Sequence, residues 1–392
     1  MSNTINKEFF SYNCPFCFLG SHNVRINNKK KIFLNKCSKL SENSKKFTLK
    51  SKPLIKGKIV TLTQAIKEIR RLLGSTDQVH LDGLGCEQRT VYKILNFAEK
   101  NKFSFDHMHS QSISNSFRSL NSIGGSLTSF NELRNRSDFL LFVDTNEKEN
   151  FPEVFVKKLG WTKKRLLKSV FFLSEKKITR NQFKHHYVDS NSSLLDELNL
   201  FKKLVYENKG TTKKFECFFN SYMSSKYPVI IPKIKSDNYP LVLATFSIVK
   251  SLNNFKRTKL FNFYGLDNSA GLVNASVIKT GFPHAVSFTD LGPFYDPIEF
   301  NSLKLSRCKD LQIFISNFDP EPKINFFKKN IFIGNPSVKN KNLFDVFIPT
   351  KTPGLDDEGI IVRPDSTSIL KLTKIVESDY MTTNKIFNLI DE

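Results

Sequence analysis

The sequence predicts an α/β protein, in which short apolar strands alternate with amphipathic helices. Residues 79–81 form a short apolar run, and a loop containing Gly83 and Gly85 follows it. The next segment places apolar side chains on one helical face from Val91 to Ala98. A strand, a glycine turn and a helix in this order form half of a βαβ unit.

The same alternation continues along the chain. Thr61 and Gln64 form a capping box at the start of a helix that ends at Gly74. The run at 139–143 is apolar throughout, as expected for a parallel strand buried on both faces. Strands are predicted at 103–105, 139–143, 169–173, 187–188 and 311–315, and helices after Pro152 and at 194–206.

The glycine pair supports two interpretations. Free N–H groups of such a loop, together with the dipole of the following helix, can bind a phosphate group. A glycine turn that only packs a strand against a helix is the other interpretation. The third glycine of a dinucleotide-binding fingerprint would fall on Gln88, so Gly83 and Gly85 alone do not decide between them.

Composition limits the possible partners. The chain has 392 residues, enough for two or three domains, and a net charge of +23. Residues 25–58 hold twelve Lys or Arg against one acid. This basic block has two interpretations: it binds a polyanion, or it is simply a solvated face of the protein. Nucleic acid is disfavoured, because the block has few aromatic residues and almost only lysine. No apolar run is long enough for a membrane span, and the scattered cysteines predict a cytoplasmic protein.

A C-x-x-C knuckle near the start of the chain is a candidate metal site. Cys14 and Cys17 form the knuckle, and Cys37 follows twenty residues later. His22 would complete a Cys3His set for structural zinc. An iron–sulfur cluster normally takes four thiolates, and simple packing of the cysteines is a third interpretation.

Histidines occur in pairs at two places. His107 and His109 belong to the loop 106–112 after the strand at 103–105, and histidines near a turn are more often structural than catalytic. His185 and His186 would face opposite ways on a strand and would not share a metal ion. Spacing alone assigns no Ser–His–Asp arrangement.

Four segments, taken together and in order, resemble the B subunit of formylmethanofuran dehydrogenase, and still more closely its relative in the bacterial formyltransferase/hydrolase complex. The resemblance implies a molybdopterin-oxidoreductase-like (formate dehydrogenase-like) α/β fold without its last domain. It implies a small domain at 1–60, an α/β domain split between 61–125 and 276–392, and a nested α/β domain at 126–275. The four segments are Cys14-Pro-Phe-Cys17, Gly265-Leu-Asp-Asn-Ser-Ala-Gly271 continuing to Thr280-Gly-Phe-Pro283, Tyr295-Asp-Pro297, and Val346-Phe-Ile-Pro-Thr-Lys-Thr-Pro-Gly354.

Two departures from the family pattern bear on catalysis. The catalytic relatives bind their cluster through C-x2-C-x3-C and a later cysteine, and here Ser21 replaces the third of the four. They bind tungsten or molybdenum through a loop cysteine, whose position is Ser112 in this chain. Cys86 belongs to the start of a different helix, and Lys39 matches a lysine that links cluster and pterin in related dehydrogenases. Because both the third cluster cysteine and the metal-binding cysteine are replaced, electrons would have neither a metal centre as their source nor a cluster as their path.

The resemblance therefore implies a non-catalytic, structural B subunit with no cofactor, in a complex with the A, C and D subunits. In that family the complex serves tetrahydromethanopterin-linked oxidation of formaldehyde to formate. Lysines of the block from Lys29 to Lys58 would hold the polyglutamate tail of a furan-type carrier. The alternative is an active tungsten or molybdenum dehydrogenase subunit, with molybdopterin or tungstopterin and a 4Fe-4S cluster on Cys14, Cys17 and Cys37.

Overall fold

The structure is a computed structural model, and it describes most of the 392 residues. The described ranges are 9–16, 24–27, 33–34, 50–144, 169–175, 186–187, 192–207, 213–233, 238–262 and 264–392, with the single residues 40 and 43.

The chain forms two compact units. Unit 1 combines Met1–Ser110 with Gly265–Glu392, and unit 2 is the continuous segment Gln111–Tyr264. Unit 2 begins and ends earlier than the predicted nested segment 126–275. Unit 2 ends before residue 275 because the helix α10 (Ser269–Thr280) packs against the helix α3 (Gln88–Lys100) of unit 1. The small domain predicted at 1–60 stays a prediction, since much of it lies outside the described residues.

Unit 1 is built on a nine-stranded sheet in the order β14-β13-β7-β6-β15-β16-β17-β4-β5. The five central strands β7, β6, β15, β16 and β17 run parallel. The strands at both edges, β14 and β13 on one side and β4 and β5 on the other, pair antiparallel. The sequence predicted three of these strands, and β6 extends beyond its predicted end to include both glycines. The strands are β4 Leu54–Ile55, β5 Lys58–Ile59, β6 Val79–Gly85, β7 Ser104–Phe105, β13 Val286–Thr289, β14 Gly292–Tyr295, β15 Leu311–Ser316, β16 Lys329–Gly334 and β17 Val346–Pro349.

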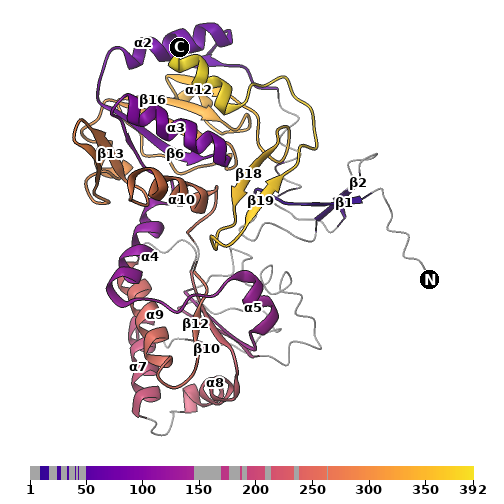
Figure 1. Cartoon of the computed structure of the whole chain (residues 1–392), viewed down its shortest axis with the longest axis vertical. Helices are drawn as coiled ribbons and strands as arrows, with labels where there is room; N and C mark the ends of the chain where they lie inside the picture. The colour runs from indigo at the N-terminus through magenta and orange to yellow at the C-terminus, as the bar shows by residue number, and fades with distance from the viewer. Residues whose placement is uncertain are drawn as a thin grey trace. The chain divides into compact units, whose positions relative to one another are not determined.

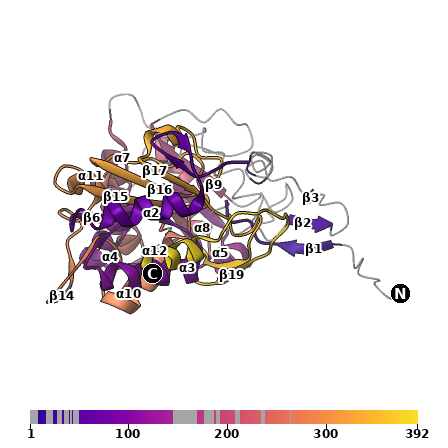
Figure 2. The same cartoon turned by 90° about the horizontal axis from the view of Figure 1, so that it is seen from above.

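The two faces of this sheet are covered differently. Alternate strand residues such as Ile313 and Ile315 join the core formed with helices, and these helices lie on one side of β15, β16 and β17 in Figure 2. Phe314 points to the opposite face, where it packs with other phenylalanines under two crossover loops, 317–328 and 335–345. Those loops contain no α-helix, although parallel strands are usually connected by one.

The helix predicted from Thr61 to Gly74 is observed in unit 1 as α2. α2 has both halves of the Thr61–Gln64 capping box and its apolar stripe is buried, so the prediction for this helix is confirmed. α2 and α3 both contact α12, as can be followed in Figure 1. The helices are α2 Leu62–Leu73, α3 Gln88–Lys100, α10 Ser269–Thr280, α11 Ser302–Leu305 and α12 Thr383–Asp391, with the 3-10 turn η2 at Lys341–Leu343.

Unit 2 has a five-stranded parallel sheet in the order β10-β9-β8-β11-β12, covered by α7, α8 and α9. The continuous apolar run at 139–143 is β8, buried on both faces as predicted. The strand predicted at 187–188 is observed one residue earlier, and the helix predicted after Pro152 lies outside the described residues. The elements are α5 Phe130–Arg136, β8 Phe139–Val143, β9 Ser169–Ser174, β10 His186–Tyr187, α7 Leu194–Glu207, α8 Lys213–Ser224, β11 Pro228–Pro232, α9 Tyr239–Leu252 and β12 Lys259–Leu260.

Two small antiparallel sheets complete the described chain. The Cys14 knuckle follows β1 of the first sheet, and the neighbouring hydroxyl of Tyr12 donates a hydrogen bond to the carbonyl of Gly354. The knuckle therefore contacts the loop after β17. The strands of these sheets are β1 Phe9–Tyr12, β2 Val24–Asn27 and β3 Phe33–Leu34, and β18 Gly359–Val362 with β19 Ile369–Leu372.

Candidate functional site

The candidate site lies at the carboxyl edge of the parallel strands of unit 1, where β6 contains a bulge. Two residues of β6, Gly83 and Leu84, lie opposite the single residue Ile315 of β15. Their φ angles are both positive, 79° and 47°. A Cβ atom on Gly83 would lie 2.5 Å from the carbonyl oxygen of Ile315. Position 83 therefore requires glycine, because the bulge brings two backbones together.

The bulge leads into α3, whose first turn is capped by Glu87. Its Oε1 accepts a hydrogen bond from the N–H of Thr90 at 2.7 Å, and Oε2 accepts one from the N–H of Arg89 at 3.0 Å. The N–H of Gly83 is also used, because it donates to Asp82 Oδ1 at 2.6 Å. These helix N–H groups are the donors that a bound phosphate would need. A carboxylate of the chain itself occupies this place.

We expect Glu87→Ala to lower the free energy of unfolding by about 1 kcal/mol, because the first turn of α3 loses its cap. The freed N–H groups should then accept sulfate, so sulfate should raise the urea midpoint of this variant more than that of the wild type. Thr61→Ala, which removes the cap of α2, is the matched control for the general effect of sulfate. An equal sulfate response in all three proteins would contradict this account of Glu87.

The loop after β7 places two histidines against the turn before α10. The N–H of His109 donates to His107 Nδ1 at 3.0 Å, so His107 carries its proton on Nε2 and faces the carbonyl of Asp267 at 3.4 Å. His109 Nε2 lies 2.8 Å from the carboxylate of Asp267. Burial lowers the pKa of His107 to about 3, helped by the neighbouring His109. His107 is therefore neutral at physiological pH.

A second pair links the same loop to the segment before β13. Asp106 Oδ1 lies 3.1 Å from His284 Nδ1, and Ser110 Oγ lies 3.2 Å from the same nitrogen. Both side chains of the pair are fully buried. Asp106 Oδ2 and His284 Nε2 have no hydrogen-bond partner among the described residues. A Ser–His–Asp triad needs serine and carboxylate on opposite ring nitrogens, so these three residues do not form one.

A third buried group lies one strand away. Asp82 Oδ2 accepts a hydrogen bond from Gln312 Nε2 at 2.9 Å. Burial, together with the charge of Asp106, raises the pKa of Asp82 to about 6. His80, near the amino end of β6, lies between the hydroxyls of Ser104 and Ser302, and burial lowers its pKa to about 3. β6 and the loop after β7 thus hold ionisable groups whose neutral forms are favoured by burial.

The turn before α10 is closed onto α3 by amide side chains. Asn268 Nδ2 donates to the carbonyl of Cys86 at 2.9 Å, and its Oδ1 accepts from the N–H of Val362 at 2.9 Å. Gln88 Nε2 donates to the carbonyl of Gly271 at 3.0 Å. A Cβ atom on Gly271 would lie 2.3 Å from the side-chain oxygens of both Asn268 and Gln88. The glycine therefore makes room for side chains of this chain.

The donor that this chain offers differs from the one expected at a pterin-bound tungsten or molybdenum centre. Ser112, which the resemblance aligns with the metal-ligating cysteine, is a buried residue in the first turn of α4 (Ser110–Ile123), and its hydroxyl is a different donor from the soft thiolate of the catalytic relatives. The helix terminus next to the glycine bulge is filled by Glu87. Among the described residues, no three His, Cys, Asp or Glu side chains come together as a metal site.

The structure places some of the sequence-predicted residues and leaves others outside its described part. Cys14 is buried in the knuckle next to Tyr12, and Cys86 is buried at the start of α3, where burial raises the pKa of its thiol. Cys17, Ser21, His22, Cys37 and Lys39 lie outside the described residues, so the zinc and iron–sulfur interpretations stay predictions.

Sequence reasoning missed most of the buried polar groups at this edge. Asp267 and His284 lie more than 150 positions from their partners, and local spacing carries no signal for such pairs. Asp267 was visible only as part of the Gly265–Gly271 segment. Glu87 had a clearer signal, since it directly precedes a helix-period segment, and acidic residues favour such positions.

Comparison with known proteins supports the fold. The sequence matches no protein-family model and no curated protein. The structure resembles a chain in the X-ray crystal structure of the formyltransferase/hydrolase complex from Methylorubrum extorquens in complex with methylofuran. The TM-score is 0.73 at 16% identity, over 86% of this chain and 97% of that chain.

A second solved structure of similar fold is acetylene hydratase from Pelobacter acetylenicus. It aligns with a TM-score of 0.60 at 10% identity, over 98% of this chain and 68% of that chain. No helix in the described part of this chain is long and apolar enough to cross a membrane. The predicted resemblance is confirmed at the level of the fold: this chain has the molybdopterin-oxidoreductase-like α/β fold of a chain in the formyltransferase/hydrolase complex.

Proposed function

We propose that this chain is the non-catalytic, structural B subunit of a formyltransferase/hydrolase complex in tetrahydromethanopterin-linked oxidation of formaldehyde to formate. The observation that carries the proposal is the fold match, which extends over 97% of a chain from such a complex. The alignment covers most of this chain and nearly all of the other. A subunit with the same domain arrangement would give such coverage, whereas one shared domain would cover only part of each chain.

The polar edge of unit 1 supports a role without catalysis. His109 bonds to Asp267, Asp106 to His284, and Glu87 to the first turn of α3, so these groups hold segments of the chain together. In place of the thiolate that binds tungsten or molybdenum in the catalytic relatives, this chain has the hydroxyl of Ser112, a different donor. The chain would act by binding the subunits that transfer and hydrolyse the formyl group.

The lysine block supports a secondary role toward the furan-type carrier. The structure describes four lysines of the block, and all have exposed side chains: Lys50, Lys52, Lys56 and Lys58. They would attract a polyglutamate tail through charge, so carrier binding should weaken as salt rises. Carrier binding that is unchanged by Lys52→Glu and Lys58→Glu would remove this role.

The alternative is an active dehydrogenase subunit with a 4Fe-4S cluster and a tungsten or molybdenum centre. One observation favours it: Cys14 is buried within a C-x-x-C knuckle that is held against the loop after β17 through Tyr12 and Gly354. A buried thiol at that place suits a cluster ligand as well as a packing residue.

The two functions separate in a test on the assembled complex. The chain is co-expressed with the transferase and hydrolase subunits, and formyl transfer, formyl hydrolysis and oxidation of the formyl group are measured with wild type and with Ser112→Ala. The structural role predicts that transfer and hydrolysis depend on the presence of the chain, stay within about twofold in the variant, and are not accompanied by oxidation. Oxidation of the formyl group by the wild-type complex, lost hundredfold or more in kcat in Ser112→Ala with an intact complex, would identify an active dehydrogenase subunit with Ser112 as a ligand or catalytic residue.

A further inference from the structure

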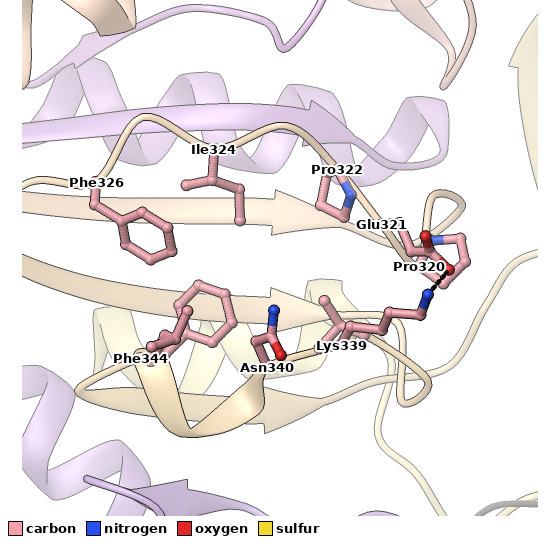
Figure 3. A pocket seen from close by; sticks show the side chains of 10 residues that line it. Pro320, Glu321, Pro322, Ile324, Phe326, Lys339, Asn340 and Phe344 are labelled. Atoms are coloured by element: carbon pink, nitrogen blue, oxygen red, sulfur yellow. Dashed lines mark ion pairs between the residues drawn. The ribbon is translucent and has the colours of Figure 1, made fainter.

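A pocket lies on the phenylalanine-rich face of the unit 1 sheet, between the two helix-free crossover loops. Figure 3 shows Phe326 and Ile324 from the loop 317–328 facing Phe344 and Asn340 from the loop 335–345. The pocket holds about 250 Å³. Cofactors and drug-sized ligands usually occupy roughly 300–1,000 Å³, so this pocket suits a single side chain.

Most of the residues that line the pocket are apolar, with Glu321, Lys339 and Asn340 as the polar members, and part of the lining is open to solvent. Phe344, which lines the pocket, packs at a tilt against Phe332 of β16, with ring centroids 4.9 Å apart. Phe326 and Leu343 keep 45% and 60% of their surface exposed, although both border the pocket. Exposed apolar side chains around an apolar depression are typical of protein interaction sites.

The surface around the pocket is basic. Residues 317–345 contain five lysines and three acids, and residues 50–61 contain four lysines and no acid. Two of the three acids are already paired, Glu321 with Lys339 at 2.8 Å and Asp345 with Lys329 at 3.7 Å. The first of these pairs stands at the rim in Figure 3. Lysines such as Lys323 and Lys341 form no ion pair with a described residue.

The two basic segments form one surface. The N–H of Lys56 donates to the carbonyl of Asp345 at 2.9 Å, and Ser51 Oγ donates to the carbonyl of Pro336 at 2.7 Å. Lys341 donates to Ser51 Oγ and lies over the ring of Phe347. Lys56, in the turn between β4 and β5, and the segment before β4 therefore lie beside the crossover loop that carries Leu343.

From these observations we propose that the pocket is a docking site for an acidic segment of a partner subunit. One apolar side chain of that segment enters the pocket beside Phe326, Leu343 and Phe344, and its carboxylates face the surrounding lysines. The inference rests on the proposed function for the identity of the partner. A polyglutamate tail has no apolar side chain for the pocket, so the apolar contact distinguishes a protein segment from the carrier.

The test measures partner binding to pocket variants of the full chain. Leu343→Asp places a carboxylate at the pocket, and it should raise the dissociation constant for the transferase and hydrolase subunits at least about tenfold. Leu291→Asp is the matched control, because Leu291 is 88% exposed in the turn between β13 and β14, at the opposite edge of the same sheet. Both changes are at the surface, so both variants should fold.

Zero-length carbodiimide coupling of the wild-type complex then identifies the partner segment. This reagent joins lysine amines to carboxylates in contact, and we expect links from Lys341 or Lys323 to acids beside an apolar residue of the partner. An effect of Leu343→Asp no larger than that of Leu291→Asp, in a wild-type chain that binds its partners, would overturn the docking site alone. A wild-type chain that binds neither subunit would overturn the proposed function, and the docking site with it.

Discussion

Gly83→Ala should lower the free energy of unfolding by about 2–5 kcal/mol. The new Cβ atom would lie 2.5 Å from the carbonyl oxygen of Ile315 and 2.8 Å from the ring of Phe314. β6 and β15 are paired backbones at the centre of the sheet, so neither can move without breaking ladder hydrogen bonds. The positive φ angle adds about 1–2 kcal/mol to the steric cost of about 1–3 kcal/mol.

Gly281→Ala is the matched control for this prediction. Gly281 has a φ angle of 82°, close to the 79° of Gly83, but a Cβ atom there would meet no atom within 4 Å. This variant should lose only the roughly 1–2 kcal/mol of the backbone conformation. Urea denaturation of both variants gives the difference directly. Equal losses would show that the bulge tolerates a side chain and that the close approach to β15 is wrong.

His107→Asn should make the free energy of unfolding less sensitive to acid. The wild type should lose roughly 4–5 kcal/mol of unfolding free energy over the titration of His107, and the variant should not lose this part. Burial lowers the pKa of folded His107 to about 3 from its ordinary value of 6.5. Between these values the unfolded chain binds a proton that the folded chain does not, so the stability contributed by neutral His107 is complete above pH 6.5. It is lost as the pH falls toward 3. Asparagine keeps an acceptor for the N–H of His109 and does not titrate.

Asp82→Asn is the companion variant with the opposite sign. Burial raises the pKa of folded Asp82 to about 6 from 3.8, so the folded chain holds a proton that the unfolded chain releases, and wild-type stability falls as the pH rises from about 4 to 6. The asparagine variant should be destabilised less than the wild type by this rise. Urea midpoints from about pH 4 to 8 measure both variants against the wild type. Parallel curves for all three proteins would contradict the buried, neutral state of this edge.

Local sequence patterns located some elements of the fold, among them three of the nine strands of the unit 1 sheet. The capping box at Thr61 located α2, and the apolar run at 139–143 located β8. The bulge in β6 was not predictable, because Gly83 and Gly85 look like an ordinary loop until β15 is placed beside them. Only the register of the two strands shows that the glycines belong to the strand.

The candidate site was predicted only in part, for a related physical reason. The histidines of residues 106–112 were noted from the sequence, but their partners Asp267 and His284 come from a segment that returns to unit 1 after the whole of unit 2. The phosphate site expected from the glycine pair requires free N–H groups in the first turn of α3. The side chain of Glu87, two residues after Gly85, accepts hydrogen bonds from these groups and so competes with a bound phosphate.

The most direct test of the proposed structural role is metal analysis of the complex, purified without oxygen together with its co-purifying subunits. We predict tungsten, molybdenum and iron far below one atom per copy of this chain, with any zinc varying with the amount of hydrolase subunit. About one tungsten or molybdenum and about four iron atoms per chain would contradict it, and would identify an active dehydrogenase subunit despite Ser21 and Ser112.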